Sequence, residues 1–348
     1  MAKSSSVILA FVVMMIIGYG LVVLKSSPSY YYTSPLAVSR HGAQHSSKEP
    51  VVVTRSQADD VTTHETLQFQ DEFMKKYSAI SKKGIDYTRK MCKKYRSVVS
   101  TMESFPNVLV NEKYKLVYCQ TAKAGTVSWC KMLLILSGYK NYSEVVKMSA
   151  PQVSNAWKKQ VSQLKRFSTQ KQTEIISTYT KIMIVRNPYT RLLSAYNDKL
   201  VAKNASDYRI GHQRMLSQKI LKRFRQGNIT GKYDPTFGEF VKMIISEEYY
   251  IHNVHWRSME SRCHPCDMNY DVIGRFEDIE NYSNYILKRI GAGIEFPHSS
   301  GTHFTNSSSH DKVKQSYATI PDEDLEDLYQ KYLYDFQLFG YEKELPKA

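Results

Sequence analysis

The sequence has few cysteines and few acidic residues. Five cysteines in 348 residues are too few for a miniprotein stapled by disulfides, so that class is excluded. Only 33 Asp and Glu oppose 48 Lys and Arg, which leaves a formal net charge of +15. With 42% hydrophobic residues the chain can bury a core, so wholesale disorder is excluded as well. A chain this basic suggests a polyanionic partner: nucleic acid, an anionic membrane, or an acidic glycan and a phosphate-bearing cofactor.

Long uncharged apolar runs are absent except near the N-terminus. Residues 7–24 form 18 consecutive residues without a charge, which as a helix would span about 27 Å, close to a bilayer core of ~30 Å. The alternative is a cleaved signal peptide, whose apolar region is usually about 7–15 residues long and is followed by a small-residue cleavage site. We therefore expect a short cytoplasmic tail over residues 1–6 and an uncleaved signal anchor over residues 7–24.

Five Asn-x-Ser/Thr sequons all follow this run, and they decide the expected orientation. Their acceptors are Asn141, Asn204, Asn228, Asn281 and Asn306. Lys3 and Lys25 flank the run on opposite sides, so charge alone leaves the orientation open. Because N-glycans are added in the secretory lumen, the sequons favour a type II membrane protein with a lumenal body. A lumenal body argues against nucleic acid as the partner of the positive charge.

The rest of the chain divides into a stem and a body, without an internal repeat. Residues 25–66 are rich in Ser, Pro and Thr with little periodicity, which is typical of a stem. From about Leu67 onward apolar residues recur at helical spacing, with Phe69, Phe73, Tyr77 and Ile80 on one face. We expect a lumenal catalytic domain over residues 67–348.

Two segments of the body read as a strand, a loop and a helix. Residues 115–119 form a short apolar strand, followed by a loop over residues 120–126 and a helical run over residues 127–137. Residues 181–185 form a second strand, and Asn187-Pro188 is a typical helix start. Alternating strands and helices predict an α/β fold with a mostly parallel sheet flanked by helices. In such sheets ligands bind where strand ends meet helix starts.

The first loop has the composition of an anion site. Residues 121–128 combine Lys123, Gly125 and hydroxyl side chains at a helix start. Backbone N–H groups and the helix dipole attract an anion there, the glycine permits close approach, and the lysine adds positive charge. The order differs from a Walker A loop, because the lysine precedes a single glycine. The alternative is an ordinary exposed turn.

The second strand exit carries Arg186, Arg191 and Ser194. On the expected helix, Arg191 and Ser194 lie three residues apart and share a face. A guanidinium at the strand tip and a hydroxyl on the next helix can hold one phosphate from two directions. The alternative is a pair of solvated surface arginines.

Together the two segments resemble the donor motifs of sulfotransferases that use 3′-phosphoadenosine 5′-phosphosulfate. The first resembles the 5′-phosphosulfate loop and the second the 3′-phosphate motif. Residues 255–291 look like the signature block of Golgi carbohydrate sulfotransferases. Residues 328–342 are similar to the C-terminus of the branch that contains the chondroitin, dermatan and N-acetylgalactosamine 4-O-sulfotransferases. The resemblance covers roughly residues 90–342 and implies a P-loop-like sulfotransferase fold in a Golgi membrane protein.

The resemblance implies roles for particular residues. Lys123 would bridge the 5′-phosphate and the transferring sulfuryl group, and Arg186 and Ser194 would grip the 3′-phosphate with support from Arg191. His255 is the expected general base, since imidazole titrates near neutral pH, and Glu277 is the rival, unless it caps a helix or forms a salt bridge. The donor-binding residues would be Ala122, Lys123, Ala124, Gly125, Thr126, Val127, Ser128, Arg186, Arg191 and Ser194. The mechanism requires no metal.

The same resemblance suggests the acceptor: the 4-position of N-acetylgalactosamine in chondroitin, with dermatan or terminal sugars of N- and O-glycans as alternatives. Two residues depart from the family pattern. Ala122 stands where the family usually has proline, and Val254 replaces a glutamate before His255. These changes leave a second hypothesis, a glycan-binding paralogue without activity.

The cysteines allow more than one interpretation. Residues 263–266 read Cys-His-Pro-Cys, which suggests a metal site or a redox pair. No second such motif or nearby His pair completes a zinc set, and a lumenal compartment is oxidising. The resemblance implies that Cys92, Cys119, Cys263 and Cys266 pair in disulfides and that Cys130 is a buried free thiol.

Three charged segments remain. The basic residues of 158–171 and of 219–225 form either solvated helix faces or a groove for a glycosaminoglycan. Asp322-Glu323-Asp324 matches the metal motif of many glycosyltransferases, a competing enzyme class. Acids at a helix start explain this match through the helix dipole, so we favour that interpretation over the glycosyltransferase one.

Overall fold

The computed structural model describes residues 57–97, 99, 107–201, 210–225, 234–246, 253–297 and 309–345. The expected cytoplasmic tail, signal anchor and most of the expected stem lie outside the described residues, as do Asn204, Asn228 and Asn306. Within the described part of the chain, no helix is both long enough and apolar enough to cross a membrane.

A five-stranded sheet with the order β3-β1-β2-β4-β5 forms the centre of the body. The strands are β1 (Val108–Asn111), β2 (Leu116–Cys119), β3 (Ser162–Gln163), β4 (Thr180–Val185) and β5 (Val272–Arg275). Strands β2, β4 and β5 are parallel, with Cys119 opposite Met183 and Val185 opposite Arg275. The carboxyl ends of the three strands therefore meet at one edge of the sheet.

The sheet is mixed, so the expectation of a mostly parallel sheet is wrong for the part that β1 forms with its two neighbours. Strand β1 pairs antiparallel with both β2 and β3. Only residues 112–115 connect β1 to β2, and a connection this short can join only antiparallel strands. Lys115 has a φ of 46° in this turn.

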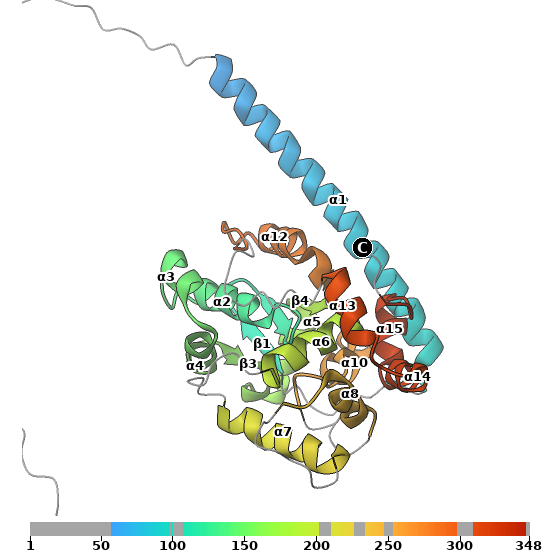
Figure 1. Cartoon of the computed structure of the whole chain (residues 1–348). Helices are drawn as coiled ribbons and strands as arrows, with labels where there is room; N and C mark the ends of the chain where they lie inside the picture. Colours follow the sequence, from blue (N-terminus) through green and yellow to red (C-terminus); the bar gives the residue numbers. More distant parts are fainter. Residues whose placement is uncertain are drawn as a thin grey trace, which may run out of the picture. The chain divides into compact units, whose positions relative to one another are not determined.

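Fourteen α-helices and two short 3-10 helices surround the sheet in the described residues (Figure 1). Those before β4 are α1 (Gln57–Tyr95), α2 (Thr126–Leu136), α3 (Tyr142–Lys147), α4 (Ala150–Gln160), η1 (Leu164–Arg166) and α5 (Thr169–Thr178). Those between β4 and β5 are α6 (Pro188–Lys199), α7 (Ile210–Phe224), α8 (Phe237–Ile245), α10 (Met259–Cys263) and α11 (Pro265–Met268). Those after β5 are η2 (Phe276–Asp278), α12 (Ile279–Arg289), α13 (His310–Tyr317), α14 (Asp322–Lys331) and α15 (Leu333–Phe339).

Both strand–loop–helix units are confirmed. Helix α2 begins one residue before the expected range, and α6 begins at the expected proline with Asn187 accepting from the N–H groups of Tyr189 and Thr190. Helix α1 begins at Gln57, ten residues before the expected start, and runs for 39 residues. The acids of residues 322–324 occupy the first turn of α14, as the helix-dipole explanation requires.

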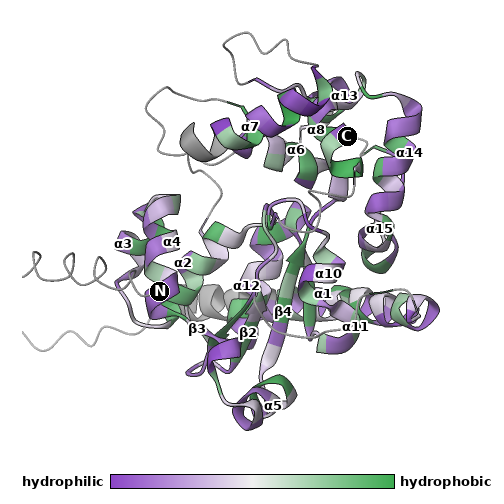
Figure 2. Ribbon diagram, turned by 90° about the horizontal axis from the view of Figure 1, so that it is seen from below, coloured by the Kyte–Doolittle hydropathy of each residue, from purple (hydrophilic) through white to green (hydrophobic). Residues whose placement is uncertain are grey.

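The two faces of the sheet bury alternate strand residues. Tyr118 and Ile184 join a core with α2, α4 and α12, whereas Cys119 and Met183 join a second core with α1, α5, α10, α11 and α15. Successive side chains of a strand point to opposite faces, so short apolar strands can serve both cores. Figure 2 shows hydrophobic residues along much of β4 and mixed faces on the surrounding helices. A third core lies among α6, α7, α8, α13 and α14.

Two disulfides fix the segment that follows residue 253 to the rest of the body. Cys92 of α1 bonds to Cys266 of α11, and Cys119 of β2 bonds to Cys263 of α10. Cys130 is free and buried. The set of four paired cysteines is thus confirmed, and because both cysteines of the Cys-His-Pro-Cys motif are oxidised, neither is a metal ligand.

Candidate functional site

The loop between β2 and α2 turns sharply at the carboxyl edge of the sheet. Lys123 and Gly125 have φ angles of 69° and 76°, in the left-handed region. Gly125 is also the N-cap of α2, and a Cβ there would collide with the side chain of Ile279. The left-handed backbone conformation therefore favours glycine at this position.

The second motif holds this loop in place. Arg191 Nε donates to the Ala122 carbonyl at 3.0 Å, and Arg186 Nη1 donates to the Lys123 carbonyl at 2.9 Å. Thr126 Oγ1 donates to the Thr121 carbonyl at 2.5 Å. The two sequence motifs, more than 60 residues apart, thus form one structural unit.

The start of α2 is suited to an anion. Gly125 offers no capping side chain, and the first turn contains no acidic residue. Val127 is exposed and Ser128 half-buried in that turn, whereas Ala122 and Ala124 of the loop are buried. N–H groups without a side-chain cap, at the positive end of a helix dipole, are the groups that bind phosphate or sulfate.

The Lys123 ammonium lies against a carboxylate from α6. Its Nζ is 3.2 Å from Asp198 Oδ2, and Lys199 Nζ is 3.1 Å from the same oxygen. Burial lowers the pKa of Lys123 to about 8, although Asp198 acts in the opposite direction. Lys123 is therefore a cation at neutral pH, and its pKa depends on the balance between burial, which lowers it, and Asp198, which raises it.

Arg186 and Arg191 are interior residues, so the alternative of solvated surface arginines is excluded. Arg186 is 3% exposed, its guanidinium lies 4.3 Å from the centre of the Phe276 ring, and burial lowers its pKa to about 10. Arg191 is 1% exposed and donates to the Arg257 carbonyl. Ser194 is buried on the same helix.

A buried carboxylate accompanies Arg191. Asp335 of α15 is fully buried, lies 3.9 Å from Arg191 Nη1, and accepts from the N–H groups of Met259 and Glu260 at 2.9 and 2.8 Å. Arg191 therefore joins the loop after β2, the 253–258 segment and the C-terminal helix.

His255 lies within the field of this cationic cluster. Burial lowers the pKa of His255 to about 3, and the charges of Lys199 and Lys123 lower it further, against a smaller opposing effect of Asp198. Its Nδ1 atom is buried without a hydrogen-bond partner among the described residues. The expectation of an imidazole that titrates near neutral pH is wrong for the protein without donor, because positive charges and burial disfavour the imidazolium.

We expect a bound polyanion to reverse this effect. Adenosine 3′,5′-bisphosphate placed on the loop would offset Lys123 and Lys199, so the pKa of His255 should rise by at least one unit. Imidazole proton chemical shifts followed against pH, with and without the nucleotide, test this. His264, at a left-handed turn between α10 and α11, is the control histidine, and an unchanged His255 titration would contradict the expectation.

Glu277 has a different position from the one that a base requires. Its Oε1 accepts from the Asn187 N–H at 2.8 Å, and its Oε2 accepts from the Tyr341 hydroxyl at 2.9 Å. The carboxylate thus fixes the start of α6 to the C-terminal segment. This supports the structural alternative that the sequence left open for Glu277.

Sequence reasoning missed Asp198, Lys199, Phe276 and Asp335. One signal was present: Arg191, Ser194 and Asp198 are spaced by three and four residues, which places them on one helix face. Phe276 and Asp335 carry no such signal, because they reach the site only through the packing of distant elements.

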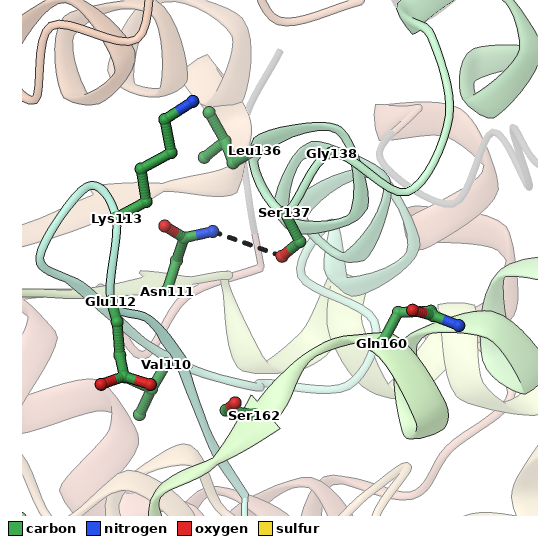
Figure 3. Close-up of a pocket in the computed structure, with 9 residues that line it drawn as sticks. All are labelled: Val110, Asn111, Glu112, Lys113, Leu136, Ser137, Gly138, Gln160 and Ser162. Carbon is green, nitrogen blue, oxygen red and sulfur yellow. Dashed lines mark hydrogen bonds between the residues drawn. The ribbon is translucent and has the colours of Figure 1, made fainter.

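A separate hollow lies away from this loop. Figure 3 shows it between β1 and the C-terminal end of α2, where Asn111 Nδ2 donates to Ser137 Oγ at 3.3 Å. Asn111 pairs with Leu116 at the start of β2, so the hollow is at the opposite edge of the sheet from Lys123. Its volume of about 240 Å³ is below the roughly 300–1,000 Å³ of small-molecule sites.

The two basic segments have similar surroundings. Most of their basic residues are exposed: Lys158, Lys159, Lys165 and Arg166 in the first segment, and Lys219, Lys222 and Arg223 in the second. Each segment also contains one ion-paired residue, Lys171 with Glu174 at 2.7 Å and Arg225 with Glu239 at 2.6 Å. Exposed positive charge of this kind can attract an anionic polymer.

Comparison with known proteins gives consistent matches. A profile described as "Sulfotransferase family" matches residues 106–342. Carbohydrate sulfotransferase 11 of Rattus norvegicus is 30% identical over 256 residues, which cover 70% of this chain and 69% of that protein. Carbohydrate sulfotransferase 14 of Danio rerio is 31% identical over 243 residues, covering 68% of this chain and 62% of that protein. Carbohydrate sulfotransferase 9 of Homo sapiens is 28% identical over 285 residues, with coverages of 78% and 61%. No solved structure matches the chain.

The profile match spans well over half of the chain, and it includes both donor-like motifs and the disulfide-linked segment. The central sheet flanked by helices agrees with it. The family implies 3′-phosphoadenosine 5′-phosphosulfate as sulfate donor and a sugar hydroxyl as acceptor. The chain belongs to the sulfotransferase family and is a carbohydrate O-sulfotransferase.

Proposed function

We propose that this enzyme transfers a sulfuryl group from 3′-phosphoadenosine 5′-phosphosulfate to the 4-hydroxyl of N-acetylgalactosamine in chondroitin. The observation that carries the donor assignment is the pair of hydrogen bonds from Arg186 and Arg191 to the loop carbonyls of Lys123 and Ala122. They join the two motifs into one anion-binding unit. The 4-position rests on the resemblance of residues 255–291 and 328–342 to the 4-O-sulfotransferase branch.

In this reaction the acceptor hydroxyl oxygen forms a bond to sulfur while the bond from sulfur to the 5′-phosphate oxygen breaks. The departing group is adenosine 3′,5′-bisphosphate, and the hydroxyl proton passes to a base. Lys123 and the first-turn N–H groups of α2 would stabilise negative charge on the leaving phosphate and the equatorial oxygens. Arg186 and Ser194, with Arg191 as support, would bind the 3′-phosphate.

His255 remains our proposed general base. It is neutral at pH 7, so it has a lone pair to accept the proton, and the donor's negative charges would stabilise the imidazolium that forms. The interaction of His255 with Lys123, Asp198 and Lys199 supports a position next to the transferred group. Glu277 is the less favoured candidate because two hydrogen bonds already engage both of its oxygens.

We further propose a Golgi type II membrane protein with a lumenal body. The uncharged run at residues 7–24, the sequons that follow it and two disulfides support this, since disulfides form and persist in oxidising compartments. Of the described acceptors, Asn141 and Asn281 are both exposed. The proposed domain boundaries are residues 1–6, 7–24, 25–66 and 67–348.

The acceptor is tested with the purified full-length enzyme and donor labelled in the sulfuryl group. Desulfated chondroitin, desulfated dermatan and desulfated heparan are offered in parallel, and the product disaccharides are mapped. We expect label on the 4-position of N-acetylgalactosamine in chondroitin.

Two other results would change the proposal. Label on dermatan would support the proposed sulfuryl transfer and show that the acceptor is dermatan. No transfer to any glycan, with intact nucleotide binding, would favour a glycan-binding paralogue, the hypothesis that Ala122 and Val254 leave open.

A further inference from the structure

The interaction between Lys123 and α6 goes beyond what the two donor motifs require. Asp198 is the last but one residue of α6 and lies one helical turn after Ser194. Its Oδ2 atom lies within 3.2 Å of two ammonium groups, those of Lys123 and Lys199. All three side chains are between 16% and 20% exposed, so water only partly screens their charges.

The charges around Lys123 are unbalanced. Among the described residues, the charged groups that act on its ammonium are Asp198 and Lys199 of α6 and Arg186 after β4, and His255 lies in the same field. Asp198 is the only anion in this group. Two further cations and burial all favour the neutral amine, so the carboxylate is what keeps Lys123 charged beside the loop.

We propose that Asp198 is the positioning residue for Lys123. Its carboxylate holds the ammonium in place until the donor binds, and the donor's phosphosulfate group then replaces the carboxylate as the partner of the ammonium. The inference rests on the proposed donor site, because it assumes that Lys123 meets the donor. In this proposal Asp198 acts only by orienting Lys123 and does not itself contact the reacting atoms.

Two opposite effects follow when the carboxylate is removed. The competitor for the ammonium disappears, which favours anion binding wherever Lys123 stays protonated. The pKa of Lys123 also falls below its present value of about 8, so the ammonium is lost at lower pH. In the Asp198→Asn variant, adenosine 3′,5′-bisphosphate should therefore bind at least as tightly as in the parent at pH 6 and about tenfold more weakly at pH 8.5, for a pKa lowered by about one unit.

The first measurement needs no donor. Full-length enzyme is treated with a trace of acetic anhydride across pH 6 to 10, and acetylation of Lys123 is quantified by mass spectrometry. We expect the midpoint for Lys123 to fall by about one pH unit in Asp198→Asn and to return to the parent value in Asp198→Glu. Lys199→Gln should shift the midpoint upward, because that variant removes a cation and leaves Asp198 to Lys123 alone. Exposed Lys140 is the internal control.

Calorimetric binding of adenosine 3′,5′-bisphosphate at pH 6 and pH 8.5 is the second measurement. An unchanged Lys123 midpoint in Asp198→Asn, or an equal loss of affinity at both pH values, would overturn the proposal and leave Asp198 a structural role only. If Asp198→Asn does not fold, the opposite shift in Lys199→Gln decides the question. If the variants show the expected shifts in the Lys123 midpoint but the parent enzyme binds no nucleotide, the proposed donor site is refuted and the interaction between Asp198 and Lys123 stands.

Discussion

Replacing Lys123 by alanine is expected to lower kcat for sulfuryl transfer by about 10²- to 10³-fold, the usual cost of removing one preorganised group that stabilises developing charge. Lys123 lies in the left-handed turn at the start of α2 and is the lysine of the proposed donor loop. Its charge would act on the bond that breaks, so kcat should fall more than the affinity for the donor. Initial rates with labelled donor at saturating acceptor give this number.

The matched control is Lys140→Ala, an exposed lysine after α2 whose ammonium lies 3.4 Å from Glu144. It removes the same charge and should leave kcat unchanged within twofold. Equal losses in both variants would show that net charge, and not the position of Lys123, carries the effect. Lys123→Arg should recover part of the rate if positive charge at this position is what matters.

Replacing Arg191 by alanine should lower the free energy of unfolding by about 3–5 kcal/mol, the range observed when one partner of a buried ion pair is removed. Arg191 and Asp335 are 1% and 0% exposed, and their charged atoms are 3.9 Å apart. The variant leaves a buried carboxylate whose remaining partners are the N–H groups of Met259 and Glu260. Urea unfolding at pH 7, compared with the parent, measures the loss.

Arg225→Ala provides the control, because Arg225 forms a more exposed ion pair with Glu239. This substitution should lower the free energy of unfolding by no more than about 1 kcal/mol.

The loss of stability in Arg191→Ala should also depend on pH. Burial raises the pKa of Asp335 above its ordinary value of 3.8, and Arg191 opposes that rise. Without Arg191 the folded state binds this proton more tightly than the unfolded state, so the deficit should be smaller near pH 4 and grow toward pH 7.

A deficit that stays constant between pH 4 and pH 7 would show that lost packing, and not the unpaired carboxylate, causes the instability. Asp335→Asn in the Arg191→Ala background separates the two contributions, because it removes the buried charge. If the charge is responsible, this double variant should be more stable at pH 7 than Arg191→Ala alone.

Sequence patterns were sufficient for the parts of the fold that local forces determine. The β2 and β4 strands follow from short apolar runs, and α6 follows from Asn187 and Pro188, since a capping amide and a proline at the first helical position act within one turn. The position of the donor-like loop follows from the order of strand, glycine and helix. These features depend on residues that are neighbours in the chain.

The resemblance to known sulfotransferases added what local patterns could not supply. It indicated which four cysteines pair and it gave the candidate roles of Lys123, Arg186 and Ser194. The connectivity itself, Cys92 to Cys266 and Cys119 to Cys263, required the structure, because each disulfide closes a loop of more than 140 residues.

The sequence by itself therefore determined the two strand–loop–helix units, the candidate donor residues and the family. Only the tertiary structure decided that β1 is antiparallel to its neighbours, that Arg191 is an interior residue paired with Asp335, and that Asp198 lies 3.2 Å from the Lys123 ammonium. It also decided that His255 lies in a field that depresses its pKa. Hydrophobic period and capping act over a few residues, whereas burial and charge pairing depend on which distant segments the packing brings together.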